Sequence, residues 1–294
     1  MYTIHQNKNI LTVNNKENTV FGKIYLEQGA SLQELSLKSN AIIQDLHPLE
    51  YKNTYASSIL FPFANRIEDG SYTFKNENFQ LAINQKEENN AIHGFINDKT
   101  FKILSQETKE NYAKVVLEYI EHKKEKGFPY TYSIQISYTF TEASLSLKVD
   151  IKNTDKNEFP FTLGWHPYFI SDNLSKSSLN FNCTKKTIIG DRNITTGIEE
   201  IENVDCFNIE NKQLDDCWIL DSDKIHFKTP KYILEFESNA DKNFMQAYTP
   251  PRANTIAIEP TTGVSNSFNN KIGLQTLNPS EEYSLTWKIN IKNN

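Results

Sequence analysis

Two side chains in this sequence stand where a proton could be moved to and from a substrate. His166 lies in the mostly apolar stretch FTLGWHPYFI (161–170), directly before a proline that favours an extended backbone at the histidine. Glu259 follows the apolar run IAI in NTIAIEPTTG (254–263), at a strand-like edge where we expect Pro260 to end the pairing. A carboxyl group beside apolar residues can have a raised pKa, and a histidine with the ordinary pKa of about 6.5 can hold or release a proton near neutrality. The two residue types suit general acid–base chemistry, although a lone buried histidine is more often structural.

Two further polar residues occur where loops meet apolar segments. Arg66 follows FPFAN and precedes a strand-like YTF, a position that could serve a binding site; a surface ion pair with Glu68 or Asp69 is an equally good interpretation. His93 precedes Gly94, which permits a tight turn or a close approach of another backbone segment. A structural role for this histidine is about as probable as a functional one.

Aromatic and acidic residues complete the candidate set. Trp165, Tyr168 and Phe169 flank the histidine motif and could form a wall on which a sugar ring stacks. Asp215 and Asp216 precede an apolar strand in QLDDCWIL, although paired carboxylates are common in turns. A histidine, carboxylates, an arginine and aromatic walls suit acid–base work on a polyhydroxylated substrate, and they suit simple carbohydrate binding equally well.

Several classes of protein are made less probable by what the sequence lacks. It has no GxGxxG, Walker, HExxH or GxSxG motif, so we expect neither a metal nor an organic cofactor. The formal net charge is −6 and no basic stripe is present, which argues against nucleic acid as a partner. No signal-peptide pattern or membrane-length apolar run occurs, and the three cysteines have no metal-site spacing. We therefore expect a cytoplasmic protein with reduced thiols, as a monomer or homodimer, acting on a small molecule.

Alternating apolar residues dominate the chain and predict the elements that must position these side chains. The clearest alternation occurs in residues 114–120, 132–140, 144–151, 231–238 and 282–292. The second and third of these segments are separated by the short turn TEA and predict a long antiparallel hairpin. Weak helical candidates are residues 31–37 and 54–61, each of which could equally be a strand or a loop. No linker divides the sequence, so we expect one all-β antiparallel domain over residues 1–294, with two or more stacked sheets.

An ordered set of motifs resembles the aldose 1-epimerase (galactose mutarotase) family. The matching stretches, which span about residues 60–290, are FPFANRIEDGSYTF, AIHGF, GFPYTYSIQISYTF, FTLGWHPYFI, LDDCWILD, IAIEPTTGVSNSF and LNPSEEYSLTWKI. The resemblance implies a galactose mutarotase-like β-supersandwich with an open cleft. It also implies a cofactor-independent isomerase that interconverts the α and β anomers of a free aldohexose such as galactose or glucose.

The same resemblance implies a role for each candidate residue. His166 fills the position of the acid that protonates the ring oxygen, and Glu259 that of the base that takes the proton of the C1 hydroxyl. Arg66 and His93 match residues that bind and orient the sugar. Asp215 matches an aspartate that binds sugar hydroxyls, and a shift of one residue would choose Asp216 instead.

Three rival functions remain open at this point. A non-catalytic carbohydrate-binding protein on the same fold would need neither the acid nor the base. A hexose-6-phosphate 1-epimerase should have additional cationic residues near its cleft, whereas the whole sequence has three arginines, Arg66, Arg192 and Arg252. A glycoside hydrolase would need two catalytic carboxylates, and the histidine motif would then have no role.

Overall fold

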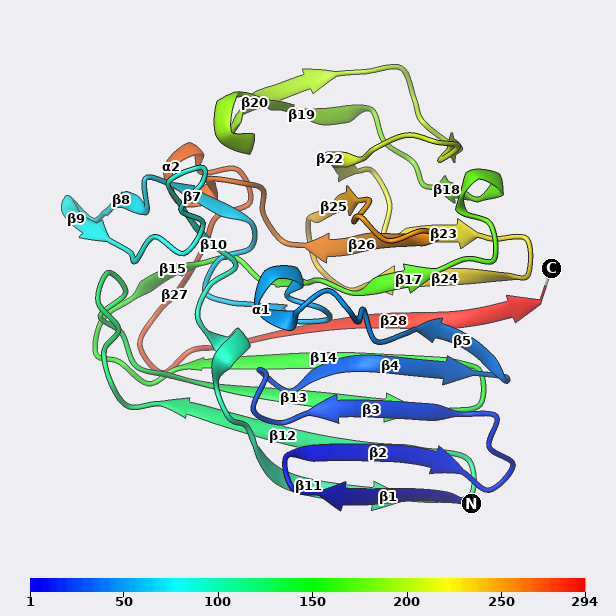
Figure 1. Ribbon diagram of the computed structural model, residues 1–294. Helices are drawn as coiled ribbons and strands as arrows, with labels where there is room; N and C mark the ends of the chain where they lie inside the picture. Colours follow the sequence, from blue (N-terminus) through cyan, green and yellow to red (C-terminus); the bar gives the residue numbers. More distant parts are fainter. Residues whose placement is uncertain (294) are drawn as a thin grey trace.

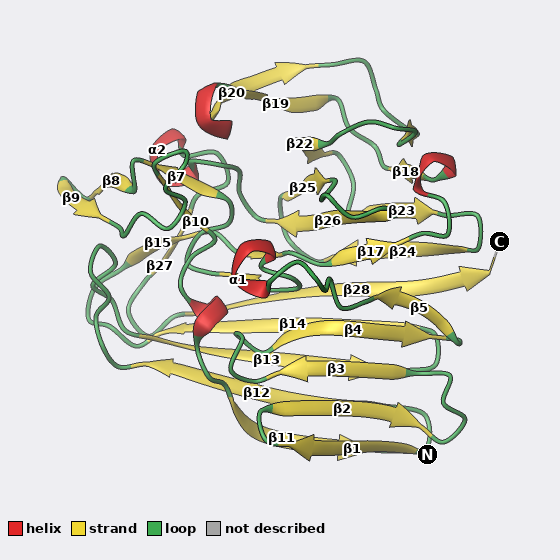
Figure 2. Cartoon of the chain, viewed as in Figure 1, coloured by secondary structure: helices red, strands yellow, loops and turns green. Residues whose placement is uncertain are grey.

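The computed structural model describes residues 1–293, and their regular structure is almost entirely antiparallel β (Figures 1 and 2). A five-stranded sheet contains, in order, β1 (Tyr2–Asn7), β2 (Ile10–Asn15), β3 (Phe21–Tyr25), β4 (Ser31–Leu37) and β5 (Asn40–Ile43). A nine-stranded sheet has the order β11 (Lys102–Thr108), β12 (Ala113–Glu121), β13 (Tyr132–Phe140), β14 (Ser144–Asn153), β28 (Glu282–Asn293), β24 (Tyr232–Ser238), β23 (Lys224–Lys228), β18 (Ser178–Asn180) and β21 (Phe207–Asn208). The all-β prediction is therefore confirmed.

A third large sheet and several small elements complete the fold. The eight-stranded sheet has the order β20 (Thr195–Glu200), β19 (Lys185–Ile189), β22 (Asp215–Leu220), β25 (Asn243–Tyr248), β26 (Thr255–Thr261), β16 (Gly164–Trp165) and β6 (Ile59–Leu60), and β17 (Tyr168–Ile170) also pairs with β26. Two-stranded sheets are formed by β7 (Arg66–Glu68) with β10 (Asn90–Ile92), β8 (Ser71–Phe74) with β9 (Glu77–Gln80), and β15 (Phe159–Phe161) with β27 (Gln275–Leu277). The helices are α1 (Tyr51–Thr54) and α2 (Ser267–Asn270), with 3₁₀ turns at Ile96–Asp98, Leu174–Lys176 and Asp191–Asn193.

The nine-stranded sheet supports the other two large sheets. Its predicted hairpin is present as β13 and β14, and Ile134 lies opposite Ile151 on the buried face. The five-stranded sheet covers β11 to β14 (Figure 1), and the Tyr138 hydroxyl donates to the carbonyl of Ala30 between the two layers. Burying the apolar face of each sheet against the other supplies the main driving force for this arrangement.

The eight-stranded sheet packs on the other part of the central sheet, near β24 and β28. Trp165 of β16 stacks on Trp287 of β28 with ring centroids 6.5 Å apart, and Phe169 of β17 meets Phe236 of β24 edge to face. One cluster of buried apolar side chains extends from β1 to β28. That continuity supports the predicted single domain, which stays a prediction and includes residue 294, outside the described residues.

The weak helical candidates are resolved in two different ways. Residues 31–37 form strand β4, because their alternating side chains pack into the core. In the segment 54–61, Thr54 ends helix α1 and Ile59–Leu60 forms the short strand β6. Both α-helices have four residues, so no helix in the described part of the chain could cross a membrane.

Candidate active site

A cavity of about 280 Å³ opens at the end of the eight-stranded sheet, between β22, β25 and β26 on one side and β7 and β10 on the other. All five residues selected from the sequence line it: Arg66, His93, His166, Asp215 and Glu259. The remaining lining residues are Lys52, Asn53, Thr54, Tyr55, Asn65, Asn84, Gln85, Glu87, Ile92, Tyr168, Gln246 and Tyr248. Segments that are far apart in the sequence therefore meet at one mostly polar cavity.

His166 is placed by a break between two short strands. Strands β16 and β17 both pair with β26, and His166 and Pro167 separate them. The backbone of His166 is nevertheless held, because its N–H donates to the carbonyl of Ser58 and its carbonyl accepts from the N–H of Ser57. Pro167 has no N–H to continue the ladder, so the chain leaves the sheet where the imidazole must enter the cavity.

Glu259 lies inside a central strand, and the expectation that Pro260 ends strand pairing is wrong. Pro260 is part of β26, opposite Met245 of β25. On its other side, β26 pairs with β16 at Thr261 and with β17 at residues 255–257, and these pairings leave out Pro260, so a residue without an N–H is tolerated there. Glu259 pairs with Gln246 of β25, and its side chain is 3% exposed.

The two candidate proton-transfer groups are in contact. His166 Nε2 lies 3.3 Å from Glu259 Oε1, and no protein group bonds to His166 Nδ1 within the described residues. Burial raises the pKa of Glu259 well above its ordinary value; the charge of Asp215 also raises it, whereas that of Arg66 lowers it. Burial lowers the pKa of His166 to about 4.

These pKa shifts correct the assumption that His166 keeps an ordinary pKa. Because burial disfavours both charged forms, it favours placing a proton shared by the pair on Glu259 and leaving the imidazole neutral. The sequence cannot show this, since the shift follows from complete enclosure of both side chains rather than from neighbouring residue types. The arrangement can donate one proton and accept one at adjacent atoms.

His93 is held against His166 by an unusual backbone conformation. Its φ is 64° and that of Gly94 is 71°, both in the left-handed region. The N–H of Phe95 then donates to the carbonyl of Phe61, which passes so close to Gly94 that a Cβ there would lie 2.1 Å from Phe61 O. This geometry places the His93 ring edge-to-face with His166, at a centroid distance of 5.1 Å. Burial lowers the pKa of His93 well below its ordinary value, with smaller effects of His166 and Arg66, so His93 is a neutral ring.

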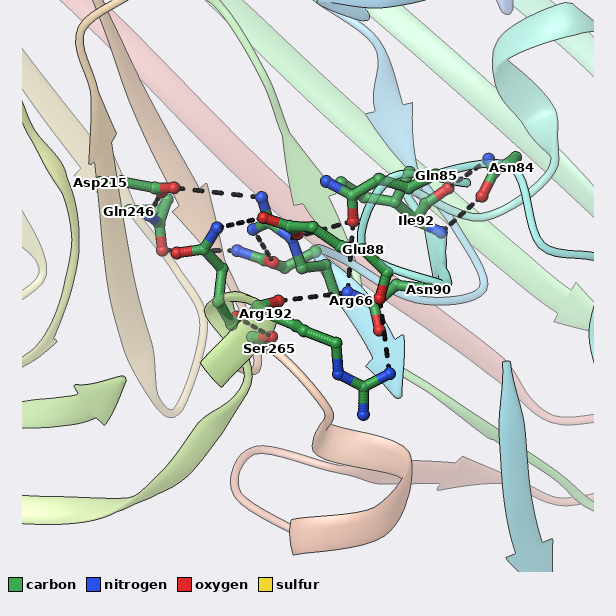
Figure 3. A network of polar contacts seen from close by, with 12 residues as sticks. Arg66, Asn84, Gln85, Glu88, Asn90, Ile92, Arg192, Asp215, Gln246 and Ser265 are labelled. Atoms are coloured by element: carbon green, nitrogen blue, oxygen red, sulfur yellow. Dashed lines mark hydrogen bonds and ion pairs between the residues drawn. The ribbon is translucent and has the colours of Figure 1, made fainter. Parts of the chain in front are cut away.

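Arg66 lines the cavity, and its closer ion pair is with Glu88 (Figure 3), whereas Glu68 and Asp69 pair with Arg192. The Nε of Arg66 donates to Glu88 Oε2 at 3.0 Å and to Gln85 Oε1 at 3.1 Å, and Nη1 donates to Asn65 Oδ1. Nη2 makes no hydrogen bond within the described residues and lies 4.0 Å from Asp215 Oδ2. The gap between this donor and this acceptor suits a ligand hydroxyl that accepts from one and donates to the other.

Asp215 and Asp216 lie on opposite faces of β22. Asp215 lines the cavity, where Gln246 Nε2 donates to its Oδ1 at 2.6 Å. Burial raises the pKa of Asp215, and the Arg66 charge opposes this shift. Asp216 is instead paired with Lys186 at 2.9 Å, outside the cavity lining. The alternation of side chains along the strand thus favours Asp215 for contact with a ligand.

The aromatic wall expected around His166 is only partly present. Tyr168 lines the cavity with its ring centroid 4.9 Å from that of His166. Trp165 and Phe169 are completely buried in the core instead, because they project from the other face of their short strands. A second aromatic residue, Tyr55, lines the cavity and meets His93 edge to face.

Most of the other polar residues that line the cavity were not identified from the sequence. Tyr55, Asn84, Gln85 and Gln246 carry no motif of their own, and the only available signal was the run of polar residues in 84–90. No three His, Cys, Asp or Glu side chains are grouped as a metal site requires within residues 1–293.

We expect Asp215→Asn to raise the KM for the substrate roughly tenfold with a smaller effect on kcat, because the amide loses a charge-assisted hydrogen bond. Asp216→Asn is the matched control and should leave both constants unchanged, since Asp216 faces Lys186 on the other side of the strand. Steady-state kinetics of the two variants test the assignment. The opposite result would assign the binding role to Asp216.

The sandwich of large antiparallel sheets and its cavity define a galactose mutarotase-like β-supersandwich. A galactose mutarotase-like protein of Clostridium acetobutylicum has a similar solved structure, with a TM-score of 0.83, 20% sequence identity, and 100% of this chain and 99% of that chain covered. A galactose 1-epimerase of Lactobacillus acidophilus NCFM is also similar, with a TM-score of 0.82, 17% identity, and coverage of 100% and 98%.

The chain belongs to the aldose 1-epimerase family, whose model matches residues 11–290. Among curated proteins it is 22% identical over 278 residues to the uncharacterized protein YihR of Escherichia coli K12, covering 89% of this chain and 87% of YihR. Membership of this family agrees with the resemblance drawn from the sequence motifs.

Proposed function

We propose that this protein is a mutarotase that interconverts the α and β anomers of an uncharged aldohexose such as galactose or glucose. The observation that carries the proposal is the buried pair in the cavity, with His166 Nε2 3.3 Å from Glu259 Oε1. The two oxygens that exchange protons in mutarotation, O1 and O5, are both bonded to C1. A donor and an acceptor that serve them must therefore lie side by side, as this pair does.

In the proposed reaction, Glu259 takes the proton of the C1 hydroxyl while His166 gives a proton to O5. The C1–O5 bond breaks as the C1 carbonyl forms, which yields the open-chain aldehyde. Rotation about C1–C2 presents the other face of the carbonyl, and O5 attacks C1 as the two groups return their protons. Protons and electrons balance within the sugar and the pair, so each group can contribute roughly 10²–10⁴-fold without a further reactant.

The proposed reaction needs one proton on the His166–Glu259 pair. The pKa shifts of the two groups indicate which of them holds it. Before a sugar binds, burial favours the proton on Glu259, whose pKa is raised, over the proton on His166, whose pKa is lowered. A hydrogen bond from the C1 hydroxyl favours the ionised carboxylate, and the carboxylate in turn favours an imidazolium 3.3 Å away. Sugar binding thereby moves the proton to His166, where ring opening requires it.

The charges of the cavity favour an uncharged sugar over a sugar phosphate. The positive charge of Arg66 is compensated by Glu88 at 3.0 Å and by Asp215 at 4.0 Å. Lys52 at the rim pairs with Glu50 at 2.8 Å, and its side chain is 74% exposed. A phosphate would thus meet no uncompensated cation among the lining residues.

Polarimetry of freshly dissolved α-D-galactose and α-D-glucose, with and without the protein, tests the proposal. We expect the protein to accelerate the approach to the equilibrium rotation without changing the end point, and to act more weakly on the 6-phosphates. Sugar binding without acceleration would identify a non-catalytic binder instead. Preferred action on a 6-phosphate would identify the hexose-6-phosphate epimerase.

We expect the pH profile of kcat/KM to stay flat well below neutrality and to fall with an acid limb near pH 4. Only the form of the pair with one proton is active, and a second proton enters as pH falls through the lowered pKa of His166, which is about 4. At high pH the activity is lost as pH rises through the raised pKa of Glu259. The rates must be corrected for spontaneous mutarotation. An acid limb near pH 6.5 would show that His166 titrates as an ordinary histidine.

A further inference from the structure

Glu88 is a carboxylate next to the cavity that the proposed reaction does not use. Its Oε2 accepts from Arg66 Nε at 3.0 Å (Figure 3). Its Oε1 accepts from Asn193 Nδ2 at 2.7 Å. Glu88 itself is not part of the cavity lining, whereas its neighbour Glu87 is. The carboxylate therefore lies behind Arg66, between that arginine and a residue from a distant part of the chain.

Asn193 belongs to the turn between β19 and β20, and this turn is fixed from several sides. Its Arg192 bonds to Glu68 at 2.5 Å and to Asp69 at 2.7 Å, which are the carboxylates that the sequence offered to Arg66. The carbonyl of Arg192 accepts from Asn90 Nδ2. Backbone φ angles of 57° at Arg192 and 58° at Asn193 are left-handed, a conformation that surrounding contacts must hold in place.

The carbonyl of Asn193 also accepts from the Ser265 hydroxyl at 2.9 Å. Ser265 lies in the segment between β26, which carries Glu259, and helix α2. The turn is thus joined to β7 and β10 on one side of the cavity and to the segment after β26 on the other. These contacts fix the position of Asn193, so its side chain can orient Glu88.

We infer that Glu88, held by Asn193, is the positioning residue that aims the guanidinium of Arg66 at the cavity. The plane of a guanidinium is fixed once two of its nitrogens are bonded, here Nε by Glu88 with Gln85 and Nη1 by Asn65. Nη2 is then the edge directed toward Asp215, free to donate to a ligand. Removing the Glu88 carboxylate leaves the guanidinium held only by the neutral amides of Gln85 at Nε and Asn65 at Nη1, which hold its orientation more weakly than a charged acceptor does.

Two variants separate this role from general structural support. Glu88→Ala should raise the KM for galactose roughly tenfold, with kcat changed less than about threefold, because a charge-assisted hydrogen bond is lost but His166 and Glu259 are untouched. Glu88→Gln should restore KM to within about threefold of wild type, since its amide oxygen still accepts from Arg66 and the Asn193 amide can turn to accept from its NH₂. Asn193→Ala should give a smaller rise than Glu88→Ala.

The matched control is Glu158→Ala. Glu158 pairs with Lys75 at 2.5 Å, its side chain is 20% exposed against 27% for Glu88, and it lies outside the cavity lining. This variant should leave KM and kcat unchanged. A KM for Glu88→Ala equal to wild type would overturn the inference, and so would a Glu88→Gln variant as impaired as Glu88→Ala.

The kinetic readout rests on the proposed function. A second readout, the exchange of the Arg66 Nε–H with water, does not depend on that function. The sequence has three arginines, and protein labelled with ¹⁵N at arginine Nε gives three side-chain signals, of which Arg66→Lys identifies one. We expect the Arg66 Nε–H to exchange with water at least about tenfold faster in Glu88→Ala, and to be unaffected in Glu158→Ala. Unchanged exchange in Glu88→Ala would overturn the positioning role. If the Arg66 Nε–H exchanges slowly in the wild-type protein and faster in Glu88→Ala, but the wild-type protein shows no mutarotation, only the proposed function is contradicted.

Discussion

Glu259→Gln should lower kcat by roughly 10²–10⁴-fold, because the amide keeps the size of the side chain and cannot take a proton from the C1 hydroxyl. The effect on thermal stability should be small, since burial raises the pKa of Glu259 and thereby favours the neutral form, which the amide resembles in size and charge. His166→Asn should lower kcat by a comparable factor for the same reason at O5. Polarimetric kinetics and thermal unfolding of the purified variants provide the measurement.

The chain offers a matched control for this experiment. His226 Nε2 and Glu235 Oε2 form a second histidine–glutamate pair at 3.0 Å, on β23 and β24, away from the cavity. Glu235→Gln and His226→Asn should therefore leave kcat at the wild-type value. If Glu259→Gln still mutarotates near the wild-type rate, Glu259 is not the base and the proposed mechanism is wrong.

Gly94→Ala should destabilise the protein by more than about 3 kcal/mol, because an alanine must adopt a left-handed conformation and also clash with a neighbouring backbone. The φ of Gly94 is 71°, and its new Cβ would lie 2.1 Å from Phe61 O and 2.4 Å from Phe61 C. Backbone atoms of a buried strand end cannot move aside as a flexible side chain can. Any protein that folds should also lose sugar affinity, since His93 precedes this glycine. Chemical denaturation followed by circular dichroism measures the first effect.

Gly197→Ala is the control for that measurement. Its added Cβ would meet only Ile188 Cδ1 at 3.5 Å, an ordinary contact distance, and its φ is not left-handed. We expect stability within about 1 kcal/mol of wild type, as for most substitutions away from such constraints. Equal stability of the two variants would mean that the chain near Phe61 moves aside easily.

The long strands could be predicted from sequence because their pattern repeats many times within one element. Residues 132–140 were predicted as a strand and are β13, and its partner β14 extends the predicted 144–151 by two residues. In both strands alternate apolar side chains are buried on one face, so a shift by one residue would expose all of them. One side of the cavity is formed by the short strands β7 and β10, which contain too few residues for any period to be visible.

The polar environment of the site could not be predicted for a different reason. Arg66 has two possible partners two and three residues away, but its ion-pair partners are Glu88 at 3.0 Å and Asp215 at 4.0 Å, and the nearer carboxylates pair with Arg192. Likewise, the low pKa of His166 arises from enclosure by several sheets. Partner choice and burial are properties of the assembled layers, and local residue types do not determine them. The candidate residues were selected by residue type and sequence context, their roles were assigned by motif resemblance, and those roles stay predictions.

The position of β28 has a consequence for how the chain is made. This strand lies between β14 and β24 in the nine-stranded sheet, yet it follows both of them in the sequence. During synthesis, the edges of β14 and β24 that later pair with β28 therefore remain unpaired until β28 has been made. The apolar side chains around Trp165 and Phe236 also remain uncovered by β28 until then. At ~5–20 residues per second, the ribosome needs on the order of several seconds to pass from the end of β24 to the end of β28. The nascent protein is exposed to aggregation for that interval, and its sheet can close only after β28 has left the exit tunnel.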